Sequence, residues 1–189
     1  VSGNAGNGIQ TFRSSFHEIG GTFVGVGADG TTSVPNGEDG VALLESSTIT
    51  VGTPELPNII ANNLGNGVSV FGTDRASVRG NSIYNNALEG INVGPGANDD
   101  IQPPIVQSAL EFTNGLRLTG TFFGVADRDY TIDLYANEQA SDDGRTYMGT
   151  VIAHTNSRGL ASFTFVGGPM PNAFQVTATA TNSNGNTSE

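Results

Sequence analysis

Two thirteen-residue stretches decide the fold, NIIANNLGNGVSV (58–70) and NSIYNNALEGINV (81–93). They align at a constant offset of 23 residues, so that Asn58 falls on Asn81 and Gly67 falls on Gly90. Self-similarity at a fixed period of this size is the signature of a stacked repeat architecture. Short β-branched runs with Asn and Gly between them indicate strands joined by tight corners, and not helices.

The repeat extends over the first half of the chain. Its mark is a glycine followed by an aliphatic residue, and this pair occurs at Gly8-Ile9, Gly40-Val41, Gly67-Val68 and Gly90-Ile91. The spacing of these steps falls from 32 to 27 to 23 residues, so the longer units must carry loops, which we place at 24–39 and 52–57. We therefore expect a short parallel β-helix of about four rungs, each of about three strands, stacked about 4.8 Å apart.

The repeat also predicts which side chains stack on one another in successive rungs. One inward column should contain Ile9, Val41, Val68 and Ile91, and a second should contain Ile19, Val51, Val78 and Ile101. At the corners, Asn can adopt the left-handed conformation and hydrogen-bond along the stack. We expect Asn62 to stack on Asn85, or Asn63 on Asn86, through their side-chain amides.

These segments resemble a known family. GGTFVGVGADGTTSVPNGEDGVAL (20–43) is similar to the long, loop-bearing rung of the right-handed parallel β-helix, pectin-lyase-like, of secreted and surface-exposed bacterial proteins. GNSIYNNALEGINVG (80–94) is similar to its ordinary rung. The resemblance covers residues 1–102 and implies a fold more than a function, because that coil hosts lyases, hydrolases, epimerases, adhesins and phage tailspikes.

A loop-forming stretch, GPGANDDIQPP (94–104), separates this half from the remainder, and we place the domain boundary between residues 102 and 103. Residues 103–189 alternate in short runs typical of an antiparallel β-sandwich. We expect strands at 105–109, 115–121, 129–136, 146–154, 159–165 and 173–181. The half resembles the bacterial immunoglobulin-like modules that often follow β-helix repeats, although it has no Cys pair and no Trp. The predicted fold class is thus all-β: a short right-handed parallel β-helix plus an Ig-like antiparallel β-sandwich.

Composition excludes several classes of function. Eighteen acidic residues against seven basic ones give a net charge of −11, and the chain contains no Lys and no Cys. A chain without a basic surface is not expected to bind nucleic acid. Disulfides, thiolate zinc sites and lysine Schiff bases are excluded, and no apolar run approaches the roughly 18 residues of a membrane span. Because the chain begins at Val1 and not at Met, we expect a processed or excised piece.

Candidates for catalysis are few. Asp39 and Glu89 occupy the same register position before their Gly steps, with Asn66 on the rung between them. Two rungs separate them by roughly 10 Å, just beyond the upper end for an inverting pair of acids. Arg79 has Gly52 and Gln102 as rung neighbours, and neither is a carboxylate. Asp39 and Glu89 remain weak catalytic candidates, and His17 and His154 are interpreted as structural.

Oxygen-rich loops can bind calcium. Of three acidic clusters, at Asn98-Asp99-Asp100, Asp127 with Asp129, and Asp142-Asp143, the first lies at the domain junction and is the preferred candidate. None has the ligand spacing of a complete calcium loop, so we expect no cofactor beyond this candidate calcium.

The expected function is non-enzymatic. We interpret the chain as an extracellular or cell-surface structural or adhesive module. Its N-terminal end, VSGNAGNG (1–8), carries no evident cap, and solenoids need one to stay soluble. That end is expected to meet upstream rungs or another copy, and head-to-tail contacts between copies generate filaments. The alternative is a polysaccharide-active enzyme, either lyase or hydrolase, or a carbohydrate-binding module, with polysaccharide as the partner.

Overall fold

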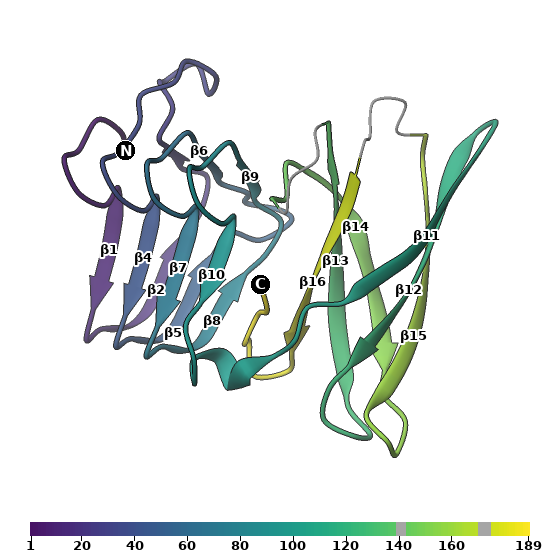
Figure 1. Cartoon of the computed structure of the whole chain (residues 1–189). Helices are drawn as coiled ribbons and strands as arrows, with labels where there is room; N and C mark the ends of the chain where they lie inside the picture. Colours follow the sequence, from purple (N-terminus) through teal and green to yellow (C-terminus); the bar gives the residue numbers. More distant parts are fainter. Residues whose placement is uncertain (139–142, 170–174) are drawn as a thin grey trace.

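A computed structural model describes residues 1–138, 143–169 and 175–189, and these form an all-β structure in two parts (Figure 1). The N-terminal part consists of three parallel sheets that stack along one axis. The first sheet contains β1 (Ile9–Phe12), β4 (Val41–Leu44), β7 (Val68–Phe71) and β10 (Ile91–Val93). The second contains β2 (Ser15–Ile19), β5 (Ser47–Val51) and β8 (Asp74–Val78). The third contains β3 (Phe23–Val24), β6 (Ile59–Ala61) and β9 (Ser82–Tyr84). The part is therefore β-helix-like, as the 23-residue repeat predicts.

The predicted inward columns are confirmed with one exception. The first column pairs in register from β1 to β10 and contains Ile9, Val41, Val68 and Ile91. The second column pairs Ile19 with Val51 and Val51 with Val78, and these residues share one core. The predicted fourth member, Ile101, is wrong: it packs against the core of the C-terminal part. A 3₁₀ turn, η1 (Asn98–Asp100), takes the chain out of the coil before Ile101 is reached.

Asparagine side chains link the rungs at one corner, and the stacking of Asn63 on Asn86 is confirmed. Asn63 Nδ2 donates to Asn86 Oδ1 at 2.9 Å, and Asn36 Nδ2 donates to Asn63 Oδ1 at 2.8 Å. Asn4 Nδ2 continues the ladder by donating to Asn36 Oδ1 at 2.9 Å. Asn36 and Asn63 are almost fully buried. The ladder supplies partners to amides that would otherwise be costly to bury.

Residues 1–8 repeat the pattern of 60–67 and 83–90. Val1 lies beside Val24: its amino group donates to Phe23 O and its carbonyl accepts from Gly25 N. The longer units carry the predicted loops, since an antiparallel bridge joins Val26 to Ser33 within 24–39 and another joins Thr53 to Leu56 within 52–57.

The C-terminal part is β-sandwich-like. One sheet contains β11 (Ile105–Phe112), β12 (Gly115–Phe123) and β15 (Leu160–Gly167), all antiparallel. The other contains β14 (Thr146–His154), β13 (Asp129–Asn137) and β16 (Gln175–Asn182). These strands match the six predicted ones closely, although residues 173–174 and Asp142 lie outside the described residues. No helix in the described ranges is long and apolar enough to cross a membrane.

Candidate functional site at the junction of the two parts

The last rung of the coil is covered by the C-terminal part on each of its three sheets. In the third sheet, Ile83 and Gly144 exchange two backbone hydrogen bonds of 2.9 and 3.1 Å. In the second, Thr187 N donates to Ala76 O at 3.2 Å. In the first, Val93 N donates to Glu189 Oε1 at 3.0 Å. Each sheet of the last rung thus has at least one backbone group bonded to the C-terminal part, which reduces the unpaired groups that strand edges expose.

A charged pair fastens the two parts beside this seam. Arg79, directly after β8, donates from Nε to Asp133 Oδ2 at 2.6 Å and from a terminal nitrogen to Asp133 Oδ1 at 2.9 Å. The Asp133 side chain is fully buried, and Thr150 Oγ1 also donates to it. Hydrogen bonding to Asp133 raises the pKa of Arg79 above its usual range. The bidentate geometry is the one in which Arg and carboxylate bind most strongly.

A second polar contact lies next to this pair. Gly80 N donates to the hydroxyl oxygen of Tyr135 at 3.0 Å. Tyr135 is almost fully buried, and this burial raises the pKa of its phenol, with the Asp133 carboxylate raising it further. The phenol therefore stays neutral and holds a backbone N–H that would otherwise be buried without an acceptor.

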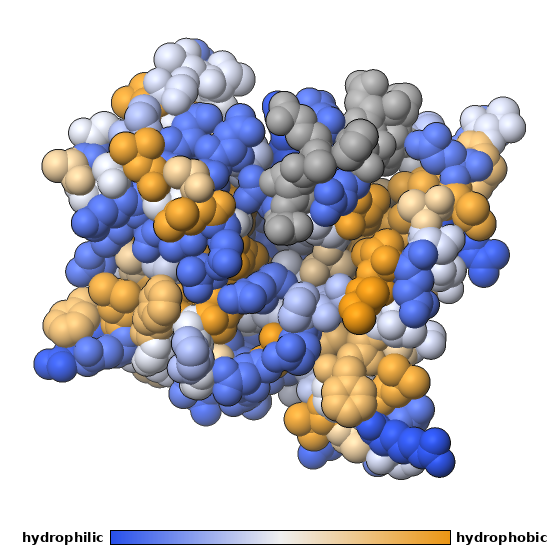
Figure 2. Space-filling view, viewed as in Figure 1, coloured by the Kyte–Doolittle hydropathy of each residue, from blue (hydrophilic) through white to orange (hydrophobic). Residues whose placement is uncertain are grey.

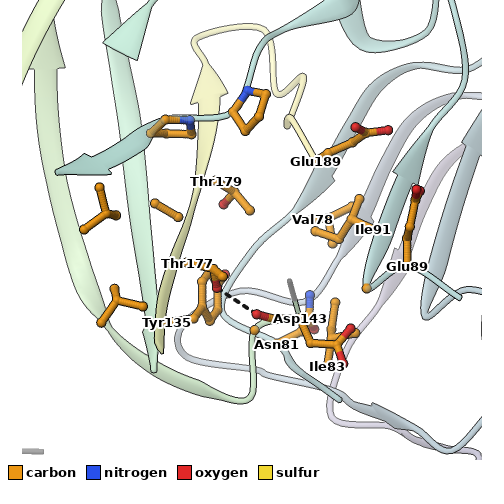
Figure 3. Close-up of a pocket in the computed structure, with 17 residues that line it drawn as sticks. Val78, Asn81, Ile83, Glu89, Ile91, Tyr135, Asp143, Thr177, Thr179 and Glu189 are labelled. Atoms are coloured by element: carbon orange, nitrogen blue, oxygen red, sulfur yellow. Dashed lines mark hydrogen bonds between the residues drawn. The ribbon is translucent and has the colours of Figure 1, made fainter. Parts of the chain in front are cut away.

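A cavity of about 390 Å³ lies inside the same junction (Figure 3). One wall is the end of the coil's core, and the opposite wall is the face of β16 turned toward the coil. Its apolar lining consists chiefly of Val78, Ile83, Ile91, Pro103, Pro104 and Val176. A partly enclosed, mainly apolar cavity between two structural parts is the usual form of a small-molecule site.

Polar side chains also line the cavity, namely Asn81, Glu89, Tyr135, Asp143, Thr177, Thr179 and Glu189. Glu89 and Glu189 are exposed, whereas Asp143 is buried and accepts from Asn85 N through Oδ2 at 3.1 Å. Thr179 is 8% exposed, and within the described parts of the chain its hydroxyl has no hydrogen-bond partner. The cavity thus combines an apolar interior with carboxylates and a buried hydroxyl, that of Thr179, which has no partner among the described residues.

Of the two weak catalytic candidates, only Glu89 lines this cavity. Asp39 lies two rungs away along the stack, and its carboxylate serves the coil itself. Oδ1 accepts from the backbone and side-chain nitrogens of Asn66 at 2.7 and 3.0 Å, and Oδ2 accepts from Ser69 Oγ at 2.6 Å. The carboxylate of Asp39 therefore replaces an asparagine in a second ladder of side chains.

The three residues considered for calcium are turned to three different partners. Asn98 is fully buried, and its amide accepts from Ala76 N and donates to Ala76 O, as a further strand would. Asp99 Oδ2 accepts from Asn182 Nδ2 at 3.1 Å, and Asp100 Oδ1 accepts from Gly96 N at 2.7 Å. Among the residues that the structure describes, no group of three or more His, Cys, Asp or Glu is placed to hold a metal ion.

Sequence reasoning missed the Arg79–Asp133 pair, because it compared Arg79 only with its rung neighbours. The two residues are 54 positions apart in different parts of the molecule, and no repeat or spacing rule connects them. The one available signal is Asp133 itself, an acidic residue within the apolar run YTIDLYA (130–136). His17 lies exposed on the first rung, paired with Ile49. His154 lies on β14 and pairs with Asp129 at 2.7 Å on the exposed surface.

Comparison with known proteins adds no family to this description. A scan against protein-family models finds no match, and a search of curated proteins finds none. The arguments that follow therefore depend on the chain's own geometry.

Proposed function

We propose that this chain is a non-enzymatic structural or adhesive module of a secreted or cell-surface protein. In this proposal the sandwich closes one end of a parallel β-helix, and the other end is a docking face for a further β layer. The proposal also assigns each part to a specific fold type: the coil is a right-handed, pectin-lyase-like β-helix, and the sandwich is immunoglobulin-like. The observation that carries it is the contrast between the two ends of the coil.

The first rung has open strand edges. In the described part of the chain, nothing pairs with the outer edges of β1 and β2, whereas each sheet of the last rung makes at least one hydrogen bond to the C-terminal part. Ile9 N donates inward to Gly40 O, so the N–H groups of Gln10 and Phe12, which alternate with it, face the open side. Unpaired edges of this kind are templates for strand addition.

Apolar side chains accompany these open edges. Phe16 on β2 is 83% exposed and Phe12 on β1 is 52% exposed. Ile9 and Ile19, which head the two inward columns, are only partly buried. Covering them would bury apolar surface at roughly 25 cal/mol per Å². The face therefore combines hydrogen-bonding groups and apolar surface, as an unfinished layer of the stack does.

The added layer comes either from further rungs or from another copy of the chain. Because each copy covers its own last rung, a copy must dock through a different surface. Two open rungs facing each other give a closed two-fold dimer, whereas an open rung against another edge, such as that of β11 or β14, gives a growing chain of copies. The Asp39 carboxylate accepts three hydrogen bonds within the coil, and this structural use supports a non-enzymatic role.

Sedimentation velocity over a range of concentrations tests docking between copies. A Gln10→Pro variant removes an outward N–H and should leave the inner ladder intact, because Gln10 N–H does not face β4. A Gln10→Ala variant changes the side chain while keeping that N–H. Parent and Gln10→Ala should associate as concentration rises, and Gln10→Pro should not. A monomer at every concentration for all three proteins would remove self-association from the proposal, and leave the docking face to be tested with an added rung.

A second candidate, carbohydrate binding, is favoured by one surface. The outward column of the first sheet carries Phe12, Leu44 and Phe71 on successive rungs, with the two rings 52% and 41% exposed. Figure 2 shows hydrophobic side chains gathered over the C-terminal ends of β1, β4 and β7, at its lower left. Two rings about two rungs, or roughly 10 Å, apart form a flat strip on which sugar rings can stack.

Affinity electrophoresis against a panel of soluble polysaccharides tests this candidate. Retardation of the parent by one polysaccharide, lost in Phe71→Ala and kept in a Phe123→Ala control on the sandwich, would establish it. Equal mobility in every gel would exclude it for that panel.

A further inference from the structure

We propose that the junction cavity is a binding site for a small organic cation with an apolar body. This inference is independent of the docking face, which lies at the opposite end of the coil (Figure 1). Three features of the cavity carry it: its apolar walls, an unpaired buried hydroxyl and the sign of the charge around it.

The walls favour an apolar body. The side chains of Val78, Ile83 and Ile91 end the inward columns of the coil, and they face the cavity instead of another rung. At about 390 Å³, the cavity lies near the lower end of the range for small-molecule sites. Its volume suits a single aromatic ring with a short chain. Such a body would take the position that side chains of a next rung occupy elsewhere in the stack.

A buried hydroxyl points to a ligand with a polar group. Thr179 lies on β16, on the face turned toward the coil, and pairs across the sheet with Asp133. Although Asp133 is its neighbour, Thr179 Oγ1 bonds to none of the described residues. Polar atoms this deeply buried nearly always have a partner. Rotation about χ1 moves Oγ1 among three staggered positions, so that this hydroxyl can turn toward the cavity.

The charge around the cavity selects a cation. Glu89 and Glu189 line it, and no arginine or histidine does so among the described residues. Arg79, which directly follows β8, binds both oxygens of Asp133 and is not available to these carboxylates. The chain has no lysine and a net charge of −11, so the electrostatic potential of the whole molecule also favours a cation.

The carboxylates and the threonines lie on different sides of the cavity, so they would contact different ends of the ligand. In Figure 3, Glu89 and Glu189 lie on the coil side beside Ile91, while Thr177 and Thr179 project from β16 across the cavity. A protonated amine next to the exposed Glu89 carboxylate would keep part of its hydration, and the apolar body would extend inward. A ligand with an anionic group would instead meet two carboxylates.

Three probes of matched shape test the proposal by ¹H–¹⁵N NMR titration: phenethylammonium, neutral 2-phenylethanol and anionic 3-phenylpropionate. The cation should give saturable shifts centred on the amides of Ile91, Thr177 and Thr179. The neutral probe should bind about fivefold more weakly, as expected for the loss of one partly exposed ion pair, and the anion more weakly still.

Substitutions at the cavity test whether the probes bind there. Glu89→Gln should weaken the cation about fivefold and leave the neutral probe unchanged. Thr179→Ile should abolish binding of both by filling the cavity, whereas Thr164→Ile, a matched change at an exposed position on β15, should alter neither. Equal affinity for all three probes, shifts centred elsewhere, or no saturable shift would overturn the proposal. Shift mapping on the parent protein decides the matter even if Thr179→Ile does not fold.

Discussion

Replacing Arg79 by Met should loosen the junction and destabilise the whole chain. Methionine keeps most of the length and the apolar stem of arginine but loses the guanidinium. The change leaves the Asp133 carboxylate, which is fully buried, without its two strongest donors at 2.6 and 2.9 Å. Thr150 still donates to it, and Tyr147 Oη lies at 3.5 Å, a distance too long to compensate.

The expected loss of unfolding free energy follows from the burial of Asp133. Breaking a buried pair by removing one side costs about 3–5 kcal/mol, because the remaining charge stays out of water. The Arg79 side chain is 25% exposed, so water can reach part of the vacated space and the lower end, about 3 kcal/mol, is expected. Replacing both residues removes the orphaned charge, so Arg79→Met with Asp133→Leu should recover most of the loss.

Urea unfolding of the parent, the two single variants and the double variant gives the double-mutant cycle. We expect one cooperative transition for the parent, since the two parts share hydrogen bonds on three sheets. A cost below about 1 kcal/mol for Arg79→Met would place the pair among ordinary surface ion pairs. A double variant no more stable than Arg79→Met would show that the orphaned carboxylate is not the cause, and either result would refute the reasoning.

Three further changes test the core, the ladder and the phenol. Val68→Asp buries an unpaired charge at a fully buried position and should cost at least about 3 kcal/mol in thermal or urea unfolding; an unchanged melting temperature would refute the register. Asn63→Ala should cost about 1–3 kcal/mol, since Asn36 loses its acceptor; melting like the parent's would show that the ladder contributes nothing. Because the folded pKa of Tyr135 is raised, the unfolded chain releases its proton first, so urea-unfolding stability should fall above about pH 10, by up to about 1.4 kcal/mol per pH unit. In Tyr135→Phe this fall should be smaller, and stability at neutral pH should be lower because Gly80 N–H has no acceptor; an identical pH profile would contradict the assignment.

The coil could be predicted because its core stacks like residues on like. A constant offset of 23 residues fixes which side chains share a column, as Ile60 and Ile83 do, and a register error would turn every apolar residue outward. The prediction failed at Ile101. This residue has the spacing of the second inward column, but the backbone leaves the coil before reaching it. Positive φ angles at Asn98, Asp99 and Asp100 turn the chain there, and the sequence spacing does not report them.

The candidate site was harder to predict, since it is made by contacts between the two parts. Arg79 and Asp133 follow no common period, and Thr179 is one of several threonines that alternate on β16. Which of them becomes buried depends on how the sandwich lies against the coil. By contrast, the repeat singled out Glu89 by its register position, although as a weak catalytic candidate and not as a residue of this cavity.

The central claim is that the open edges of β1 and β2 accept a further β layer. Residues 1–8 repeat the pattern of 83–90, so a copy of residues 67–82 placed before Val1 continues the 23-residue register. Its strands should stack on the first rung, and a control with aspartate at the copied Val68 and Val70 positions should not. Hydrogen exchange of the Gln10 and Phe12 amides measures the docking directly. Strong protection in the extended chain, with exchange as fast as the parent's in the control, is the predicted result. Rapid exchange of both amides in the extended chain would contradict the claim.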